Sequence, residues 1–298
     1  MHKDNFTGDC RRSDYDTASF FTPRPASRKG LKVHSRLSEL IEILDLEQIE
    51  ENVFRGQHQV EDRRRLYGGQ IMAQALVAAG RTVDATRPPH SLHGYFMRPG
   101  DPSIPVLFSV ERIRDGRSFS TRRIVAIQHG KAIFSMDASF QEVEKGLEHF
   151  QQIPDVMRPV EEKAARDQFI TFHVEYKEKQ ANKSMPPRQN HWFKSNGLIA
   201  SDNRLLHAAL LTFQSDDALL STSRLPHLGT FKRSDMQSAS LDHAMWFHDP
   251  DARVDHWILY SLDAPLSSAT RGYNRGAMFS ERGHLIASTM QESLMRLR

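Results

Sequence analysis

The chain has 298 residues, 39% of them hydrophobic and 26% charged, which is enough for about two domains with substantial cores. Forty basic and 37 acidic side chains leave a net charge of +3, and neither sign gathers into the long run typical of nucleic-acid binding. A single cysteine, Cys10, excludes an internal disulfide and a cysteine-rich zinc cluster.

Membrane and export signals are missing from the sequence. No apolar run approaches the roughly 20 residues of a membrane-spanning helix, and the first residues lack the apolar core of a signal peptide. We therefore expect an intracellular, cytoplasmic protein without a membrane span.

The two halves of the chain carry similar motifs in the same order. The spacing is 149 residues from Ser91 to Ser240 and 150 residues from Gln141 to Gln291. The matching segments are 91–99 with 240–248, 121–122 with 270–271, and 139–141 with 289–291. Several matches at a nearly constant spacing predict a structural unit that occurs twice.

The first half begins with a polar segment. Residues 1–34 contain few aliphatic side chains, so we expect a disordered arm. An amphipathic helix is predicted near 37–44, and a second helix, apolar on nearly every side, over 66–80. Strands are expected over 106–110, 118–127 and 132–140, separated by Asp115-Gly116 and His129-Gly130 turns.

The second half repeats this plan after a change in composition. Residues 146–190 are rich in Lys, Glu, Gln and Pro and are interpreted as a linker between units at 35–145 and 191–298. A helix is predicted over 203–218. The strands expected after it are 240–247, 256–263, 270–279 and 284–295.

Two glycines, Gly68 and Gly69, open the apolar helix of the first half. The N-terminus of a helix presents unpaired N–H groups and a positive dipole end, so it suits a phosphate or a developing oxyanion. A tight turn from strand to helix explains the same pair of glycines, and the sequence leaves both interpretations open.

The pattern as a whole indicates an α+β fold with one apolar helix packed on each antiparallel sheet. The signatures of serine hydrolases, nucleotide-binding loops and zinc peptidases are absent from the sequence. Those classes are therefore disfavoured.

Five motifs together carry a resemblance to a known family. They are 54–56, 66–70, 93–100, 242–248 and 287–292, and the similarity extends over about residues 37–296. The chain resembles the acyl-CoA thioesterase II family. This resemblance implies a double hotdog, in which two curved antiparallel sheets are each wrapped round a central helix.

The resemblance also implies the catalytic residues. The family uses an Asp at the second helix, a Thr or Ser at the start of the next strand and a Gln on the last strand. In this sequence these are Asp216, Ser240 and Gln291. Asp217 follows directly, but neighbours on a helix point about 100° apart, so only one of the two can face the strand.

The expected function is hydrolysis of acyl-CoA to fatty acid and CoA by an activated water molecule. A carboxylate, a hydroxyl and an amide around one water can do this without a metal or an organic cofactor. A hotdog enoyl-CoA hydratase and a non-catalytic acyl-CoA-binding protein are the alternatives. The resemblance further implies a homo-oligomer, a dimer or a tetramer, with no nucleic-acid partner.

In the first half, Ser91 and Gln141 are taken as the counterparts of Ser240 and Gln291. The residues 78–80 stand where the carboxylate would fall, and they are Ala, Ala and Gly. We therefore expect the first unit to be catalytically silent.

Overall fold

The computed structural model describes residues 36–58, 65–159, 169–173 and 183–298. The predicted disordered arm, 1–34, lies outside the described residues.

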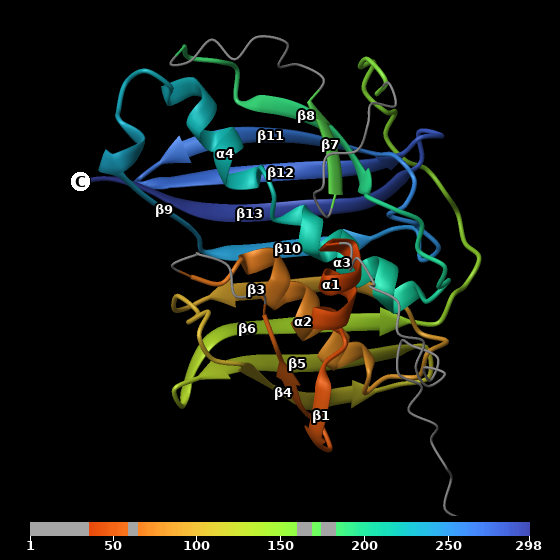
Figure 1. Ribbon diagram of the computed structural model, residues 1–298. Helices are drawn as coiled ribbons and strands as arrows, with labels where there is room; N and C mark the ends of the chain where they lie inside the picture. Colours follow the sequence, from red (N-terminus) through yellow and green to blue (C-terminus); the bar gives the residue numbers. More distant parts are fainter. Residues whose placement is uncertain (1–35, 59–64, 160–168, 174–182) are drawn as a thin grey trace, which may run out of the picture.

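In the described residues, one antiparallel sheet of 13 strands forms the body of the protein (Figure 1). The order along the sheet is β1-β2-β4-β5-β6-β3-β10-β13-β12-β11-β8-β7, with β9 paired to β13 beside this path. In the first half the strands are β1 (Glu47–Glu50), β2 (Val53–Gly56), β3 (Pro89–Phe96), β4 (Val106–Asp115), β5 (Phe119–Gln128) and β6 (Lys131–Gln141). In the second half they are β7 (Phe169–His173), β8 (Arg188–Ser195), β9 (Met236–Ser240), β10 (Asp242–Phe247), β11 (Ile258–Ser268), β12 (Arg271–Ser280) and β13 (Leu285–Leu297).

The strand order is the same when read inward from either end. Each half follows the same order when it is read outward from the middle of the sheet. The order is β3, β6, β5, β4, β2 in the first half and β10, β13, β12, β11, β8 in the second. The two halves join where β3 pairs with β10, through Gly94 opposite His243. The predicted α+β double hotdog is confirmed, with the two curved sheets joined edge to edge into one.

The register of the repeat differs from the sequence-based match. The β5–β6 ladder shifts after Ala126–Phe134, and the β12–β13 ladder shifts in the same way after Met278–Ala287. Phe134 therefore corresponds to Ala287, 153 residues later, and the same spacing joins Ala138 to Gln291. The predicted match of Gln141 with Gln291 is wrong, because an offset of 150 rather than 153 places a side chain on the opposite face of a strand.

The helices lie against one face of the sheet. They are α1 (Arg36–Leu44), α2 (Gly68–Gly80), α3 (Arg204–Ser215) and α4 (Leu219–Arg224), with short 3₁₀ turns at Leu225–His227 and Arg233–Asp235. Asn203 caps α3 by accepting a hydrogen bond from the Leu206 amide at 3.1 Å. The predicted helix 203–218 ends earlier, at Ser215, because Ala218 adopts a left-handed backbone with φ of 69°.

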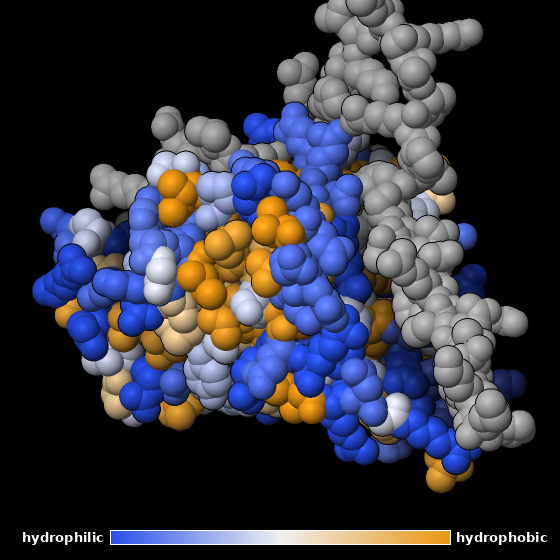
Figure 2. Space-filling view, turned by 90° about the horizontal axis from the view of Figure 1, so that it is seen from below, coloured by the Kyte–Doolittle hydropathy of each residue, from blue (hydrophilic) through white to orange (hydrophobic). Residues whose placement is uncertain are grey.

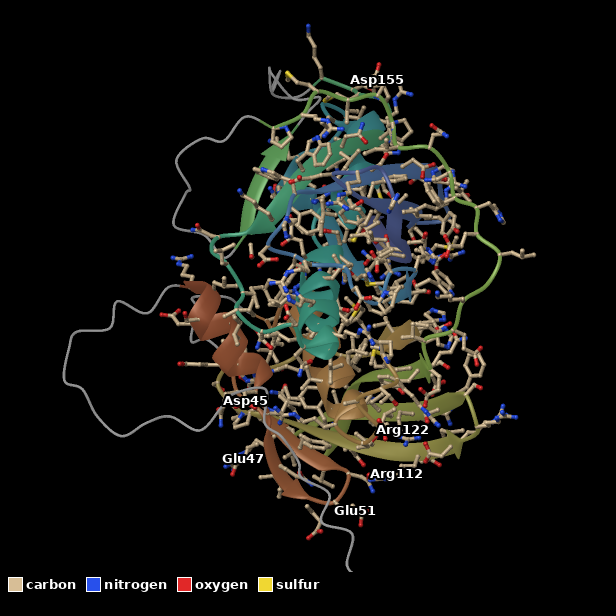
Figure 3. All side chains as sticks on the ribbon, turned by 90° about the vertical axis from the view of Figure 1, so that its right-hand side faces the viewer. Asp45, Glu47, Glu51, Arg112, Arg122 and Asp155 are labelled. Atoms are coloured by element: carbon tan, nitrogen blue, oxygen red, sulfur yellow. The ribbon has the colours of Figure 1, made fainter. Side chains whose placement is uncertain are left out.

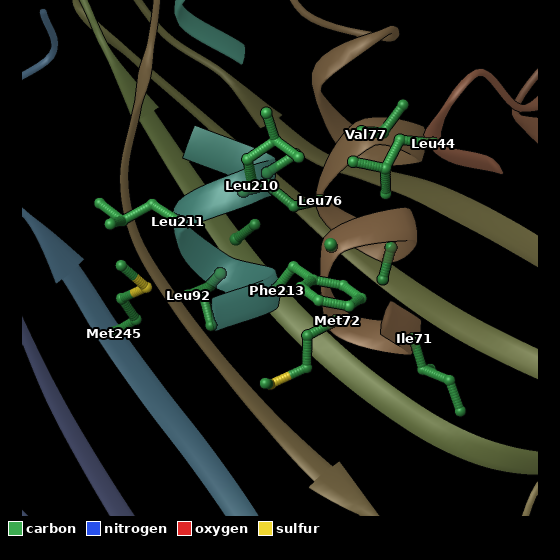
Figure 4. Packing of buried hydrophobic residues seen from close by; sticks show 14 of the residues in the cluster. Leu44, Ile71, Met72, Leu76, Val77, Leu92, Leu210, Leu211, Phe213 and Met245 are labelled. Atoms are coloured by element: carbon green, nitrogen blue, oxygen red, sulfur yellow. The ribbon is translucent and has the colours of Figure 1, made fainter. Parts of the chain in front are cut away.

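The core is centred on the contact between α2 and α3 (Figure 4). Leu76 of α2 and Leu210 of α3 are fully buried there, with Met72 and Phe213 one turn away. Small residues such as Ala75 and Ala79 let the helices and the sheet approach closely, which explains why α2 is apolar on all sides.

The segment predicted as a linker contains strands. β7 and the first residues of β8 fall within 146–190, and β8 is buried over most of its length. This strand was not predicted from the sequence, because the residues before Trp192 are polar (Arg-Gln-Asn-His). The last three of them are buried only because other segments of the folded chain pack over them. The Trp192 indole donates to the Met157 carbonyl at 3.0 Å. Ile153 and Val156 pack against the buried cluster that contains Trp192.

Within the described residues, none of the helices has the length and apolar character needed to cross a membrane.

The α2–α3 contact predicts a large effect of truncation. We expect Leu210→Ala to lower the free energy of unfolding by about 2–5 kcal/mol, since it leaves a cavity between two helices that cannot collapse freely. Chemical denaturation measures this. Leu198→Ala is the control, because Leu198 is 89% exposed and its loss should change stability by less than about 0.5 kcal/mol.

Candidate active site

The C-terminus of α3 meets the N-terminus of α2. Asp216 follows the last residue of α3, and its Oδ2 accepts a hydrogen bond from the Gly69 amide at 3.1 Å. The Tyr67 hydroxyl donates to the Phe213 carbonyl at 3.0 Å and ties the same two helix ends together. Asp216 therefore lies at the positive end of the α2 dipole.

The paired glycines are required by this close approach. A Cβ on Gly68 would lie 2.8 Å from Asp216 Oδ2, and one on Gly69 would collide with the Phe213 carbonyl oxygen. The two glycines therefore serve a tight approach of chain segments, and the binding of a phosphate or an oxyanion at this helix end stays a prediction. The anion at the Gly69 amide is the protein's own Asp216 carboxylate.

Ser240 and Gln291 lie beside Asp216. The Ser240 hydroxyl is 3.4 Å from Asp216 Oδ1, and the Gln291 amide nitrogen donates to Ser240 Oγ at 3.1 Å. Ser240 is the last residue of β9, two residues before the start of β10, whereas the prediction placed it at the start of a strand. Leu241 links these two strands, which both pair with β13, and its amide donates to the Glu292 carbonyl at 2.9 Å. The three predicted residues thus come together from three elements.

Desolvation dominates the electrostatics of Asp216. The side chain is largely enclosed, and burial, reinforced by the negative charge of Asp217, raises its pKa to about 7. The Gly69 amide, the Ser240 hydroxyl and the Arg65 charge act in the opposite direction. Asp217 itself is exposed and accepts from the Gln214 side chain at 3.3 Å, so Asp216 is the carboxylate that faces Ser240.

Other buried polar side chains, which the sequence analysis did not single out, surround the three. Ser215, His243 and Ser293 are fully buried and hydrogen-bonded to one another or to Gln291. Asn274 donates to the Gln291 carbonyl at 3.3 Å. The spacing of Gln291 and Ser293 is a signal that was available, because alternate residues of a strand share a face.

Burial also sets the charge state of His243. Its pKa is lowered to about 4 by desolvation, against the raising effects of the Gln291 hydrogen bond and the Asp242 charge. The imidazole is therefore neutral near neutral pH.

The first half has apolar residues where the second half has these polar groups. In the matched registers, Pro89 corresponds to Ser240, Ala138 to Gln291 and Leu92 to His243. Ser91 and Gln141 are not the counterparts, contrary to the prediction. The end of α2 is followed by Arg81 in the place of Asp216.

One charged residue of the first half occupies an equivalent buried position. Arg122, which is labelled in Figure 3 and matches Asn274, is 1% exposed. It donates to the Thr82 hydroxyl at 2.8 Å and to Asp115 at 2.7 Å. These bonds pair the buried guanidinium with a hydroxyl and a carboxylate, which is a structural role.

In the part of the chain that the structure describes, no group of three His, Cys, Asp or Glu side chains is arranged to hold a metal ion.

Comparison with known proteins agrees with the geometry. A model of the acyl-CoA thioesterase family matches residues 160–294, and a model of the acyl-CoA thioesterase N-terminal domain matches residues 59–141. Acyl-coenzyme A thioesterase 8 of Mus musculus is 38% identical over 302 residues, covering 92% of this chain and 93% of its own. Acyl-CoA thioesterase 2 of Haemophilus influenzae is 36% identical, covering 87% of this chain and 98% of its own.

A solved structure extends the similarity to three dimensions. The acyl-CoA thioesterase II TesB2 of Mycobacterium marinum is 39% identical and superposes with a TM-score of 0.76, covering 87% of this chain and 98% of its own. With two matching family models and similarity along nearly the whole chain, this protein belongs to the acyl-CoA thioesterase II family.

Proposed function

We propose that this acyl-CoA thioesterase acts by direct attack of water on the thioester carbonyl, with Asp216, Ser240 and Gln291 as its catalytic residues. The observation that carries the proposal is the convergence of a carboxylate, a hydroxyl and an amide within hydrogen-bonding reach of one another. The carboxylate has a pKa of about 7, which suits a general base near neutral pH.

In this mechanism Asp216 takes a proton from the water while the water oxygen attacks the carbonyl carbon. The carbon–sulfur bond then breaks, and the proton on Asp216 passes to the departing CoA sulfur. Ser240 and Gln291 hold the water in line, so both products, free acid and CoA thiol, form without a covalent intermediate.

The two alternative functions fit the site less well. A hydratase adds water to a carbon–carbon double bond through a paired Asp and His. In this structure the carboxylate is bonded to a hydroxyl and a backbone amide, and His243 is turned toward Gln291. A non-catalytic binding protein has no need of a desolvated carboxylate with a raised pKa.

We infer that the second unit begins at β7 and not at residue 191. β7 and β8 occupy the places that β1 and β2 occupy in the first half, and the matching family models leave residues 142–159 between them.

We also propose that the protein is a homo-oligomer, in which a second copy covers the outer edge of the first half. Large apolar residues are exposed on the strands of this edge: Ile49 of β1 and Leu107 and Ile113 of β4. Figure 2 views the molecule from this side and shows apolar residues gathered near the middle. Exposed sheet edges of this kind are normally paired or covered.

Asp216 provides the first test of the mechanism. We expect Asp216→Asn to lower kcat for thiol release from acyl-CoA by about 10²- to 10⁴-fold, because Asn keeps the shape but cannot accept the proton. KM and the melting temperature should change far less. Asp217→Asn is the matched control, and its kcat should fall by less than about tenfold. If Asp217→Asn were inactive and Asp216→Asn active, Asp217 would be the general base.

The pKa of Asp216 predicts the pH dependence. Since the carboxylate is the active form, kcat/KM should rise with pH through about 7 and then level off. The charge of Asp217 raises this pKa, so Asp217→Asn should move the midpoint to lower pH. A pH–rate profile that is flat between pH 5 and 9 would contradict the assignment.

The raised pKa of Asp216 also affects the stability of the folded protein. The folded protein binds the Asp216 proton more tightly than the unfolded chain, whose pKa is about 3.8. This group therefore makes the free energy of unfolding fall as the pH rises from about 4 to about 7, and Asp216→Asn should remove that contribution.

Oligomerisation is tested by light scattering. We expect a mass of at least twice 34.2 kDa, and we expect Ile113→Glu to shift the protein toward the monomer, because it places a charge in the apolar contact. Leu198→Glu, at an exposed site of the second half, should leave the mass unchanged. A fully active wild-type monomer at dilute concentration would disprove the proposal.

A further inference from the structure

We propose that His243 is a positioning residue, whose ring holds the Gln291 amide with its NH₂ group facing Ser240. This inference rests on the proposed function, in which Ser240 and Gln291 hold the attacking water. It adds a fourth side chain, which does not touch the substrate.

His243 joins the end of α3 to the last strand. Its Nδ1 lies 2.8 Å from Gln291 Oε1, and its Nε2 lies 3.0 Å from the Ser215 hydroxyl. Ser215 directly precedes Asp216 in the chain. The contacts thus form a closed ring that runs from Asp216 through Ser215, His243, Gln291 and Ser240 back to Asp216.

The Gln291 amide has only one orientation that uses all of its hydrogen-bonding capacity. With Nε2 toward Ser240, its two N–H groups donate to Ser240 Oγ and Ser293 Oγ, both at 3.1 Å. Oε1 then accepts from His243 Nδ1. In the reversed orientation one N–H of this buried amide has no acceptor, which costs about 1–3 kcal/mol.

This orientation determines which nitrogen of His243 carries the proton. Nδ1 must be the N–H, because the atom it faces is the amide oxygen of Gln291. Nε2 is then an acceptor, and the single hydrogen of the Ser215 hydroxyl is shared between Nε2 at 3.0 Å and the Thr212 carbonyl at 2.8 Å.

The consequence for the site is the direction of the Ser240 hydroxyl. Because Ser240 Oγ already accepts from Gln291, its own hydrogen is available to Asp216 or to the water beside it. If the amide were reversed, its oxygen would compete for that hydrogen. His243 therefore controls, through Gln291, the direction in which Ser240 donates.

The first half shows that the fold itself does not need this histidine. Leu92 occupies the matching position on β3 and is 3% exposed, and Ala138 stands in the place of Gln291. Apolar side chains thus satisfy the same position in the same fold. At these positions of the described chain, the half that contains Asp216 has hydrogen-bonded polar side chains and the first half has apolar ones.

Enzyme kinetics of the His243→Leu variant test the inference, since Leu is the residue of the other half. We expect kcat to fall by about 10- to 100-fold with KM little changed, because the amide and the hydroxyl lose their fixed orientation. His243→Asn should recover most of the activity, since its side-chain N–H can occupy the place of Nδ1. Equal activity of His243→Leu and wild type would overturn the proposal.

A second buried histidine supplies the control. His207 lies in the first turn of α3 and bonds to the Ser201 carbonyl at 3.0 Å, remote from Gln291 in the network. His207→Leu should lower stability while kcat stays within about twofold of wild type. If His243→Leu and His207→Leu lower kcat equally, His243 is only a structural residue.

Ring-nitrogen NMR gives a readout that does not depend on activity. In the protein labelled with ¹⁵N-histidine, the signals that disappear in His243→Asn belong to His243. We expect a neutral ring with the proton on Nδ1 at pH 7. A proton on Nε2 would show the reversed network and disprove the inference.

The two proposals fail separately. If Asp216→Asn and Gln291→Ala remain active, the proposed function of these residues is wrong, whatever His243 does. If both lose activity while His243→Leu does not, only the positioning role is lost.

Discussion

The hydrogen bond from the Gly69 amide to Asp216 is the interaction on which the site depends. It joins the first turn of a helix from one half to the end of a helix from the other, so neither half can form the site alone. The glycines at 68 and 69 allow the contact, and the α2–α3 packing maintains it. Joining two hotdog units in one chain thus brings the carboxylate to a helix N-terminus.

The same contact balances two opposing effects on Asp216. Burial raises the free energy of the charged form, while the amide and the positive helix end lower it. Burial is the larger effect, so the pKa lies near 7 rather than near 4. A carboxylate in this range can accept a proton and return it within one reaction cycle at neutral pH.

In the proposed mechanism, the first half contributes to stability and the second half carries the reacting side chains. The first half has apolar residues at the positions of the polar groups of the second half. Pro89 stands in place of Ser240, Leu92 in place of His243, and Ala138 in place of Gln291. A buried polar group is costly unless every hydrogen bond is made, which is why the second half needs a connected network rather than three isolated side chains. The first half supplies the apolar scaffold and the N-terminus of α2.

Much of the fold could be read from the sequence, because hydrophobic periodicity and turn residues are local. The apolar helix at 66–80, the strands after it and the second copy of this plan are all visible in the pattern. The strand β8 was missed, because its polar residues are buried only by the segment that packs over them.

The candidate site divides in the same way. Asp216, Ser240 and Gln291 were named from family motifs in the sequence. The match of Gln291 with Gln141 was wrong, because the register of a strand pair depends on turn length and not on sequence similarity. The contacts of His243, Ser215 and Ser293 entered only with the structure. Their role depends on which atoms face one another across three elements, and that is decided by tertiary packing.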